Sequence, residues 1–179
     1  MGREMFARYM PVSPRRDLPT SGVVRLATEA DLDACARLAV ARDGGDASVW
    51  ISRLSEHLAA DDAALFVADV GDVVGFGRVA WFAPPDDAPG NAAPSGYYLL
   101  GLLVDTQWRR GGLGERLTAA RLAWVWERAA ECWYFANAGN RASLDLHERL
   151  GFRPVTRDFC FPGVTFEGGE GVLSRAVRR

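Results

Sequence analysis

Residues 97–114, YYLLGLLVDTQWRRGGLG, decide the fold of this chain. The first part of the stretch, Tyr97–Val104, is short and almost wholly apolar, which is typical of a buried strand. A loop with Gly111, Gly112 and Gly114 follows. Apolar residues then return at helical spacing, at Leu113, Leu117, Ala120 and Trp124. The stretch therefore predicts a strand, a glycine-bearing loop and a helix, in that order.

This loop has the properties of a phosphate-binding site. The first turn of a helix leaves backbone N–H groups without partners, and together with the helix dipole these groups attract an anion. Glycines let the backbone approach an oxygen closely and adopt positive φ. Arg109 and Arg110 add guanidinium groups that can pair with phosphate through two hydrogen bonds. Several nucleotide-binding folds share this arrangement, so the loop by itself does not select one of them.

Three segments together resemble one family. The spacing of Val104, Arg109, Gly112 and Gly114 is similar to the pyrophosphate loop of the GNAT acyl-CoA N-acyltransferases. Residues 140–152, NRASLDLHERLGF, resemble the Asn…Tyr-Glu-x-Leu-Gly-Phe segment of the same family, with His147 where the family usually has tyrosine. Residues 24–32 resemble its first strand and the start of its first helix. The resemblance covers most of the chain, from residue 23 to residue 178.

The resemblance implies an α+β fold: a mixed, mostly antiparallel sheet of six or seven strands with helices on both faces and splayed strands four and five. The residue pattern predicts helices over 32–42, 47–58, 113–128 and 141–150. It predicts strands over 23–27, 64–70, 73–82, 97–104, 132–137, 152–161 and 172–177. Because a long helix joins strand 97–104 to strand 132–137, these two strands should run parallel.

The length of 179 residues fits one domain, and we assign residues 23–179 to a GNAT-like N-acetyltransferase domain. Residues 1–22 show no periodicity and are expected to form a flexible arm; a dimer contact, and with it a homodimer, or a lid are the alternatives. No apolar run reaches membrane-spanning length, and the N-terminus lacks the apolar core of a signal peptide, so we expect no membrane partner and a cytoplasmic location. The net charge of −2, without a long basic run, speaks against nucleic acid.

The scarcity of ligands argues against a metal site. Cys35, Cys132 and Cys160 lie far apart, no C-x-x-C is present, and His57 and His147 are the only histidines. Every basic residue is arginine, and the lack of lysine excludes a Walker A loop and Schiff-base chemistry.

If the family resemblance holds, acetyl-CoA is the co-substrate. Backbone N–H groups of residues 109–114 would hold its pyrophosphate, main-chain groups of residues 102–104 would pair with its pantetheine arm, and an N–H near Leu102 would polarise the thioester carbonyl. Asn140, Ser143 and His147 share one helix face on the cofactor side. The expected cofactor-binding residues are therefore Leu102, Leu103, Val104, Arg109, Arg110, Gly111, Gly112, Leu113, Gly114, Asn140, Ser143 and His147.

His147 and the backbone of Leu102 are the expected catalytic groups. Histidine has an ordinary pKa of ~6.5, so His147 is expected to act as the general acid that protonates the leaving thiolate. The general base is open, because Leu100 and Gly101 stand where many relatives carry a carboxylate just before Leu-x-Val. The remaining candidates for the base are Tyr97, Tyr98, Asp43, Asp46, Glu167 and Glu170.

The leading hypothesis is an N-acetyltransferase that transfers an acetyl group directly to a primary amine of a small molecule or a protein N-terminus. The missing carboxylate and tyrosine motivate a second hypothesis, a domain that binds acetyl-CoA as a sensor. A dinucleotide-binding oxidoreductase is a third, although Leu117 stands in place of the third glycine of its signature. We expect the acceptor site to be lined by residues 43–46, 83–96 and 167–171.

Overall fold

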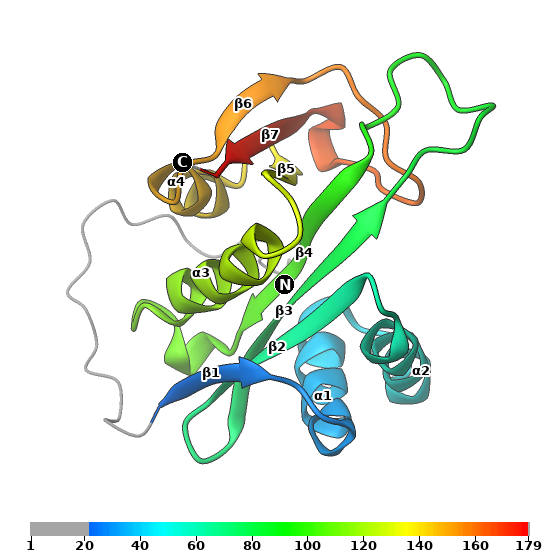
Figure 1. Ribbon diagram of the computed structural model, residues 1–179. Coiled ribbons are helices and arrows are strands. Elements are labelled where there is room, and N and C mark those ends of the chain that lie inside the picture. Colours follow the sequence, from blue (N-terminus) through cyan, green and yellow to red (C-terminus); the bar gives the residue numbers. More distant parts are fainter. Residues whose placement is uncertain (1–21, 179) are drawn as a thin grey trace.

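One mixed sheet organises the molecule, with its strands in the order β1-β2-β3-β4-β5-β7-β6 (Figure 1). This computed structural model describes residues 22–178, so the predicted arm lies outside the described part except for its last residue. The strands are β1 (Val23–Leu26), β2 (Ala63–Asp69), β3 (Val73–Phe82), β4 (Gly96–Val104), β5 (Glu131–Asn137), β6 (Arg153–Thr156) and β7 (Gly171–Val177). The α-helices are α1 (Leu32–Asp43), α2 (Ala47–Ala59), α3 (Leu113–Trp126) and α4 (Arg141–Arg149).

Two hydrophobic cores lie on opposite faces of this sheet, which confirms the prediction of helices on both faces (Figure 1). Alternate residues of β2 separate the two cores, as expected for a strand buried on both sides. Phe66 packs in the core with Leu117 of α3, whereas Val67 packs with Cys35 of α1 and Leu54 of α2. The sheet is therefore the middle layer between α3 and the α1–α2 pair.

The strands β4 and β5 run parallel, as predicted, but they pair only over a short stretch. Tyr97, Tyr98 and Leu99 of β4 face Cys132, Trp133 and Tyr134 of β5. Beyond this stretch β4 continues to Val104 beside β3, and β5 continues to Asn137 beside β7. The two strands consequently diverge, which confirms the predicted splay and leaves an opening in the middle of the sheet.

A β-bulge in β4 lies at the start of this opening. Arg78 of β3 faces Leu100, but Phe76, two residues earlier, faces Leu103, so β4 contains one extra residue. Gly101 has a φ of 51° there, in the left-handed region that glycine tolerates. The bulge reverses the alternation of side chains: Leu99 before it and Leu102 after it both pack against the α3 core.

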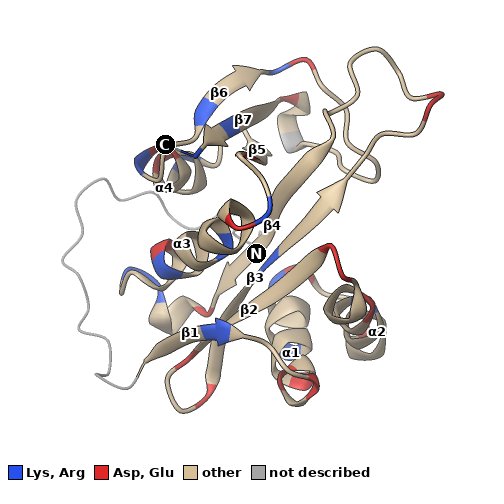
Figure 2. Cartoon of the chain, in the orientation of Figure 1, with Lys and Arg blue, Asp and Glu red and all other residues tan. Residues whose placement is uncertain are grey.

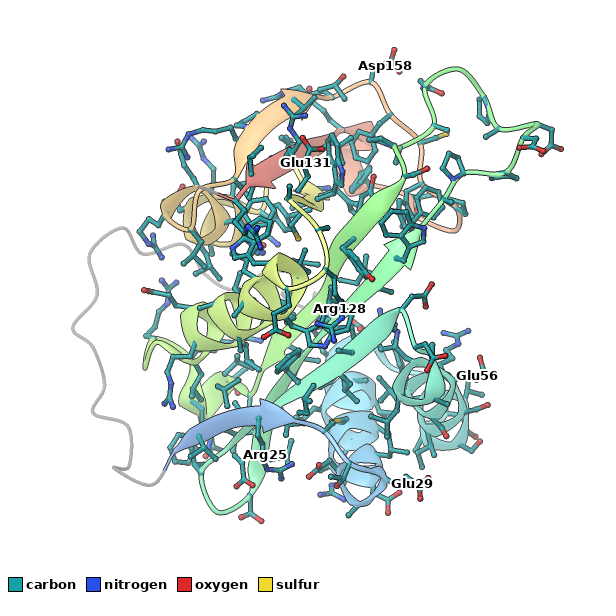
Figure 3. The ribbon with its side chains drawn as sticks, in the orientation of Figure 1. Arg25, Glu29, Glu56, Arg128, Glu131 and Asp158 are labelled. Atoms are coloured by element: carbon teal, nitrogen blue, oxygen red, sulfur yellow. The ribbon has the colours of Figure 1, made fainter. Side chains whose placement is uncertain are left out.

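The predicted strand 152–161 was too long, because β6 ends at Thr156. Phe159 and Phe161 of this segment pack instead in an aromatic cluster with Phe135. The backbone of Cys160 bonds to Asn91 and Ala93 in the long loop after β3. Asp158, labelled near the top of Figure 3, follows β6, and its carboxylate accepts a hydrogen bond from Asn91 Nδ2 at 2.7 Å. Apolar residues that suggested a strand thus serve loop packing.

Candidate active site

The opening between β4 and β5 contains a cavity of about 420 Å³. Residues 99–102 of β4 line one wall and residues 134–136 of β5 line the other. Three of the predicted cofactor-side residues contribute to it, namely the α4 N-cap residue Asn140 and the α4 residues Ser143 and His147. The remaining lining residues are Arg78, Arg121, Phe161, Pro162 and Val164. Among the described side chains, which exclude that of Glu167, none from the expected acceptor segments 43–46, 83–96 and 167–171 lines this cavity, whereas Phe161, Pro162 and Val164 do.

The glycine loop precedes α3 as predicted, and Gly112 is the N-cap residue of the helix with a φ of 84°. Arg110 also has a positive φ, of 69°, a conformation that is costly outside glycine. Two such residues around Gly111 form a concave turn of the kind that binds anions through backbone N–H groups. Among the described residues, no protein atom accepts a hydrogen bond from the N–H groups of residues 111–114.

The loop adjoins the cavity. The position of a Cβ on Gly114 would lie 3.8 Å from Leu102 Cδ2 and 3.6 Å from Leu146 Cδ2, so the start of α3 lies between β4 and α4. The carbonyl oxygen of Leu102 accepts a hydrogen bond from Arg42 Nη1, and that of Val104 accepts one from Arg109 Nε, both at 3.0 Å. Leu103 and Leu113 are buried in the two cores, so only their backbone can face a ligand.

Asn140 and Ser143 link α4 to β5. Asn140 Oδ1 accepts a hydrogen bond from the Ser143 N–H at 3.2 Å, which confirms the predicted helix cap. Ser143 Oγ accepts a hydrogen bond from the Tyr134 hydroxyl at 2.6 Å. The first turn of α4 is therefore fixed against the β5 wall of the cavity.

His147 is buried, with 2% of its surface exposed. Its Nδ1–H donates to the Ser143 carbonyl at 2.8 Å, and its ring stacks on Tyr134 with a centroid distance of 3.5 Å. Burial lowers the pKa of His147 from 6.5 to about 3, and the charge of Arg121 acts in the same direction. The ring is therefore neutral near pH 7, with its lone pair on Nε2. The expected role of general acid does not fit this ring, because it lacks the second proton of an imidazolium and its remaining proton, on Nδ1, is bonded to the Ser143 carbonyl.

Tyr134 is the proton-bearing group that sequence reasoning missed. Burial raises the pKa of its hydroxyl, which outweighs the opposing effects of Ser143 and Arg121. The hydroxyl thus keeps its proton at neutral pH and lies on the cavity wall. No sequence signal marked it, since a tyrosine within an apolar strand is usually a packing residue.

Two arginines, Arg78 and Arg121, line the cavity and bring positive charge to it. Arg121 of α3 is 1% exposed and donates to the carbonyl oxygens of Leu117, Arg78 and Leu100. Burial lowers its pKa to about 10, so it stays charged. A Cβ on Gly77 would lie 2.9 Å from Arg121 Nε, so this glycine makes room for the guanidinium. The sequence did hold a signal here, because Arg121 continues the apolar spacing of Leu113 and Leu117.

Most predicted base candidates are engaged elsewhere. Asp43 pairs with Arg42 at 2.7 Å, and Asp46 caps α2 through Ser48. The Tyr98 hydroxyl donates to the Pro94 carbonyl, and burial raises its pKa. The other two carboxylates are equally uninformative: Glu170 pairs with Arg157, and the Glu167 side chain lies outside the described part. Tyr97 packs edge-on against Trp124.

No group of three or more His, Cys, Asp or Glu side chains in residues 22–178 is arranged to hold a metal ion. None of the described helices is long and apolar enough to cross a membrane.

Comparison with known proteins gives consistent results. The family model for the acetyltransferase (GNAT) family matches residues 27–152. The aminoglycoside N(6')-acetyltransferase type 1 of Stenotrophomonas maltophilia is 30% identical over 149 residues, which cover 80% of this chain and 94% of that protein. The mycothiol acetyltransferase of Salinispora arenicola is 38% identical over 93 residues, and this match spans 51% of this chain but only 29% of that protein.

Among solved structures, the ribosomal-protein-alanine N-acetyltransferase from Brucella melitensis superposes with a TM-score of 0.67 at 24% identity. The match covers 87% of this chain and 99% of that one, and at this identity it speaks to the fold alone. The splayed sheet, the loop before α3 and the family match over residues 27–152 lead to one conclusion: this chain belongs to the GNAT family of acetyltransferases.

Proposed function

We propose that the chain transfers an acetyl group from acetyl-CoA directly to a primary amine of a small molecule or a protein N-terminus. One observation carries this proposal: the N–H groups of residues 111–114, unpaired within the described chain, adjoin a cavity that opens between β4 and β5. The loop fits a diphosphate, and the cavity between strand edges fits an extended arm with a reactive end. Acetyl-CoA would supply the acetyl thioester and leave as a thiol.

The residues of the cavity then divide the work. The edge of β4 beyond Leu99 has no partner strand toward β5, so a backbone N–H near Leu102 is available to the thioester carbonyl. Such a preorganised donor contributes ~3 kcal/mol to transition-state stabilisation. The Tyr134 hydroxyl holds a proton and replaces His147 as the proposed donor to the thiolate. His147 Nε2 can accept a hydrogen bond, and its neutral ring orients Tyr134 by stacking.

The amine needs no side-chain base in this scheme. No carboxylate is present among the described residues that line the cavity. We infer that the acceptor either binds as the uncharged amine or binds as the ammonium ion and loses its extra proton to water before it reacts. The amine nitrogen then bonds to the carbonyl carbon, the carbon–sulfur bond breaks, and the sulfur takes the Tyr134 proton. The proton that the nitrogen loses on forming the amide returns through water to the Tyr134 oxygen, so the hydroxyl is restored.

Calorimetric titration with acetyl-CoA, followed by thiol release with a panel of amines, tests the proposal. Heat of binding together with turnover would support it. Binding without turnover on any amine would favour the acetyl-CoA sensor, and no heat at millimolar acetyl-CoA would contradict the cofactor assignment.

Asn140→Asp separates the cofactor role of this residue from its role as a helix cap. A carboxylate also accepts from the Ser143 N–H, so the cap and the free energy of unfolding should be kept. The added negative charge should weaken acetyl-CoA binding about tenfold if Asn140 faces the cofactor. An unchanged affinity would leave Asn140 as a cap only.

A further inference from the structure

The guanidinium of Arg78 is an unused cation at the cavity. Among the described residues it donates no hydrogen bond and forms no ion pair. No buried side-chain nitrogen in the described part lacks a partner, so the Arg78 nitrogens must reach open space, and Arg78 lines the cavity. It is also the only charged residue of β3, which Figure 2 draws tan apart from one blue segment.

A glycine places Arg78 at this position. Its side chain crosses over Gly101 in the bulge of β4, where a Cβ would lie 3.0 Å from both Nε and Nη2 of the guanidinium. Gly101 is also, with Leu100, one of the two positions where the family resemblance implies a carboxylate. In this chain the same place has no side chain of its own and is covered by a positive charge.

The charged residues around Arg78 make this part of the cavity more positive still. Burial lowers the pKa of Arg78, and the nearby cations Arg42 and Arg53 of α1 and α2 lower it further. Asp43 opposes them, but its two carboxylate oxygens already pair with Arg42 at 2.7 and 2.8 Å. With Arg121 on the opposite side, the cavity is lined by two arginines and no carboxylate. A half-buried, unpaired cation is unfavourable unless an anion joins it.

We propose that the acceptor of this transferase carries a carboxylate or a chemically equivalent oxyanion next to its amine, as a small amino acid does, and that Arg78 binds that group. The proposal rests on the proposed function and names its substrate class. A guanidinium pairs with a carboxylate through two charge-assisted hydrogen bonds, which would hold the neighbouring amine in a fixed direction. Acceptors that bring only positive charge, such as polyamines and aminoglycosides, are repelled by the same arginines.

The test compares matched acceptors that differ only in the anionic group. A panel of amino acids is assayed by thiol release, and the best substrate is compared with its primary amide and with the amine that lacks the carboxylate. Aminomethylphosphonate distinguishes a phosphonate from a carboxylate as the preferred oxyanion. We expect kcat/KM for the amino acid to exceed that for its amide about tenfold or more. Arg78→Gln should bring this ratio close to one, and Arg78→Lys should restore part of it.

Arg37→Gln is the matched control, because it removes an exposed arginine of α1 that does not line the cavity, and it should keep the ratio. Calorimetric titration of the coenzyme-A-loaded protein with the same amino acids gives a readout that does not need turnover. Turnover with equal preference for acid and amide would overturn the anion site and leave the acetyltransferase standing. The anion site would also be overturned if the protein binds acetyl-CoA but neither binds nor acetylates amino acids. Failure to bind acetyl-CoA would instead contradict the proposed function itself.

Discussion

Tyr134 and His147 stack against each other at the cavity and differ in their protonation at neutral pH. Burial moves their two pKa values in opposite directions, because it penalises the phenolate in one case and the imidazolium in the other. The tyrosine therefore keeps its proton and the histidine stays without its second one. Because Tyr134 of the preceding strand β5 lies against it, a histidine at the position of the family tyrosine need not take over the role of that tyrosine.

Tyr134→Phe should lower kcat about 100-fold, with KM for acetyl-CoA nearly unchanged, since only the proposed proton donor is lost. The stacking surface is kept, and loss of the bond to Ser143 should cost ~1 kcal/mol of stability. Steady-state thiol release measures the effect. His147→Phe is the matched variant and should lower kcat less than about tenfold. The opposite order of the two losses would return the acid role to His147.

The buried imidazole also makes stability depend on pH. The pKa of His147 is about 3 in the folded chain, against an ordinary value of 6.5 once the chain unfolds, so between these values the unfolded chain binds the extra proton. The free energy of unfolding should therefore fall as pH drops below 6.5 and gain nothing from this group above it. Urea unfolding at about pH 7.5 and about pH 5 measures this change.

His147→Gln should lose less stability on acidification than the unchanged chain. His57 contributes in the same direction, because burial lowers its pKa as well, so His57→Gln provides the comparison. Asp31, with a pKa of about 2, acts only at more acidic pH. Equal losses for the parent chain and His147→Gln would show that the ring is protonated in the folded state.

At the scale of elements, the bulge of β4 determines both the shape and the charge of the cavity. It ends the pairing with β5, turns Leu102 toward the α3 side, and lets Arg78 cross the strand at Gly101. A bulge next to an active site that redirects a side chain is a recurrent device in sheets. Here the redirected side chain belongs to the neighbouring strand.

Gly101→Ala should therefore affect both stability and specificity. A left-handed alanine costs ~1 kcal/mol, and its Cβ would displace the Arg78 guanidinium. We expect a loss of 1–2 kcal/mol in urea unfolding, about what strain and displacement together imply, and a weaker preference for amino acids over their amides. Gly90→Ala is the control, because no atom lies within 4 Å of its added Cβ and its φ is not left-handed. If Gly101→Ala keeps the full preference for amino acids over their amides, the bulge has no part in acceptor binding.

At the scale of the molecule, Arg121 joins the helix layer to the sheet. Its guanidinium reaches from α3 to the sheet and donates to the carbonyl oxygens of Arg78 on β3 and Leu100 on β4, at 3.1 and 3.3 Å. Leu100 is the residue at which β4 stops pairing with β5. Arg121→Met would remove the guanidinium from these part-buried acceptors, so we expect a loss of about 2 kcal/mol in urea unfolding. Arg37→Met, at an exposed site of α1, should change stability by less than about 0.5 kcal/mol. If Arg121→Met also loses less than about 0.5 kcal/mol, water must take the place of the guanidinium at these carbonyl groups.

The sequence predicted what depends on local pattern. The loop before Leu113, the cap at Asn140 and the parallel pairing of β4 with β5 follow from spacing, side-chain chemistry and chain connection. It did not predict what depends on pairing between distant segments: the bulge at Gly101, the stacking of Tyr134 on His147, and the course of Arg78. The overlong last-but-one strand has the same origin, since Phe159 and Phe161 pack their rings against Phe135 of β5 instead of continuing β6.

The contact between Gly77 and Arg121 has an evolutionary consequence. Any larger residue at position 77 meets a buried guanidinium 2.9 Å from its first side-chain atom, while a shorter residue at position 121 strands two carbonyl groups. Each change made alone should therefore cost stability, so the effect of a substitution at one site should depend on the residue at the other. Descendants of this sequence should alter them together or leave both untouched.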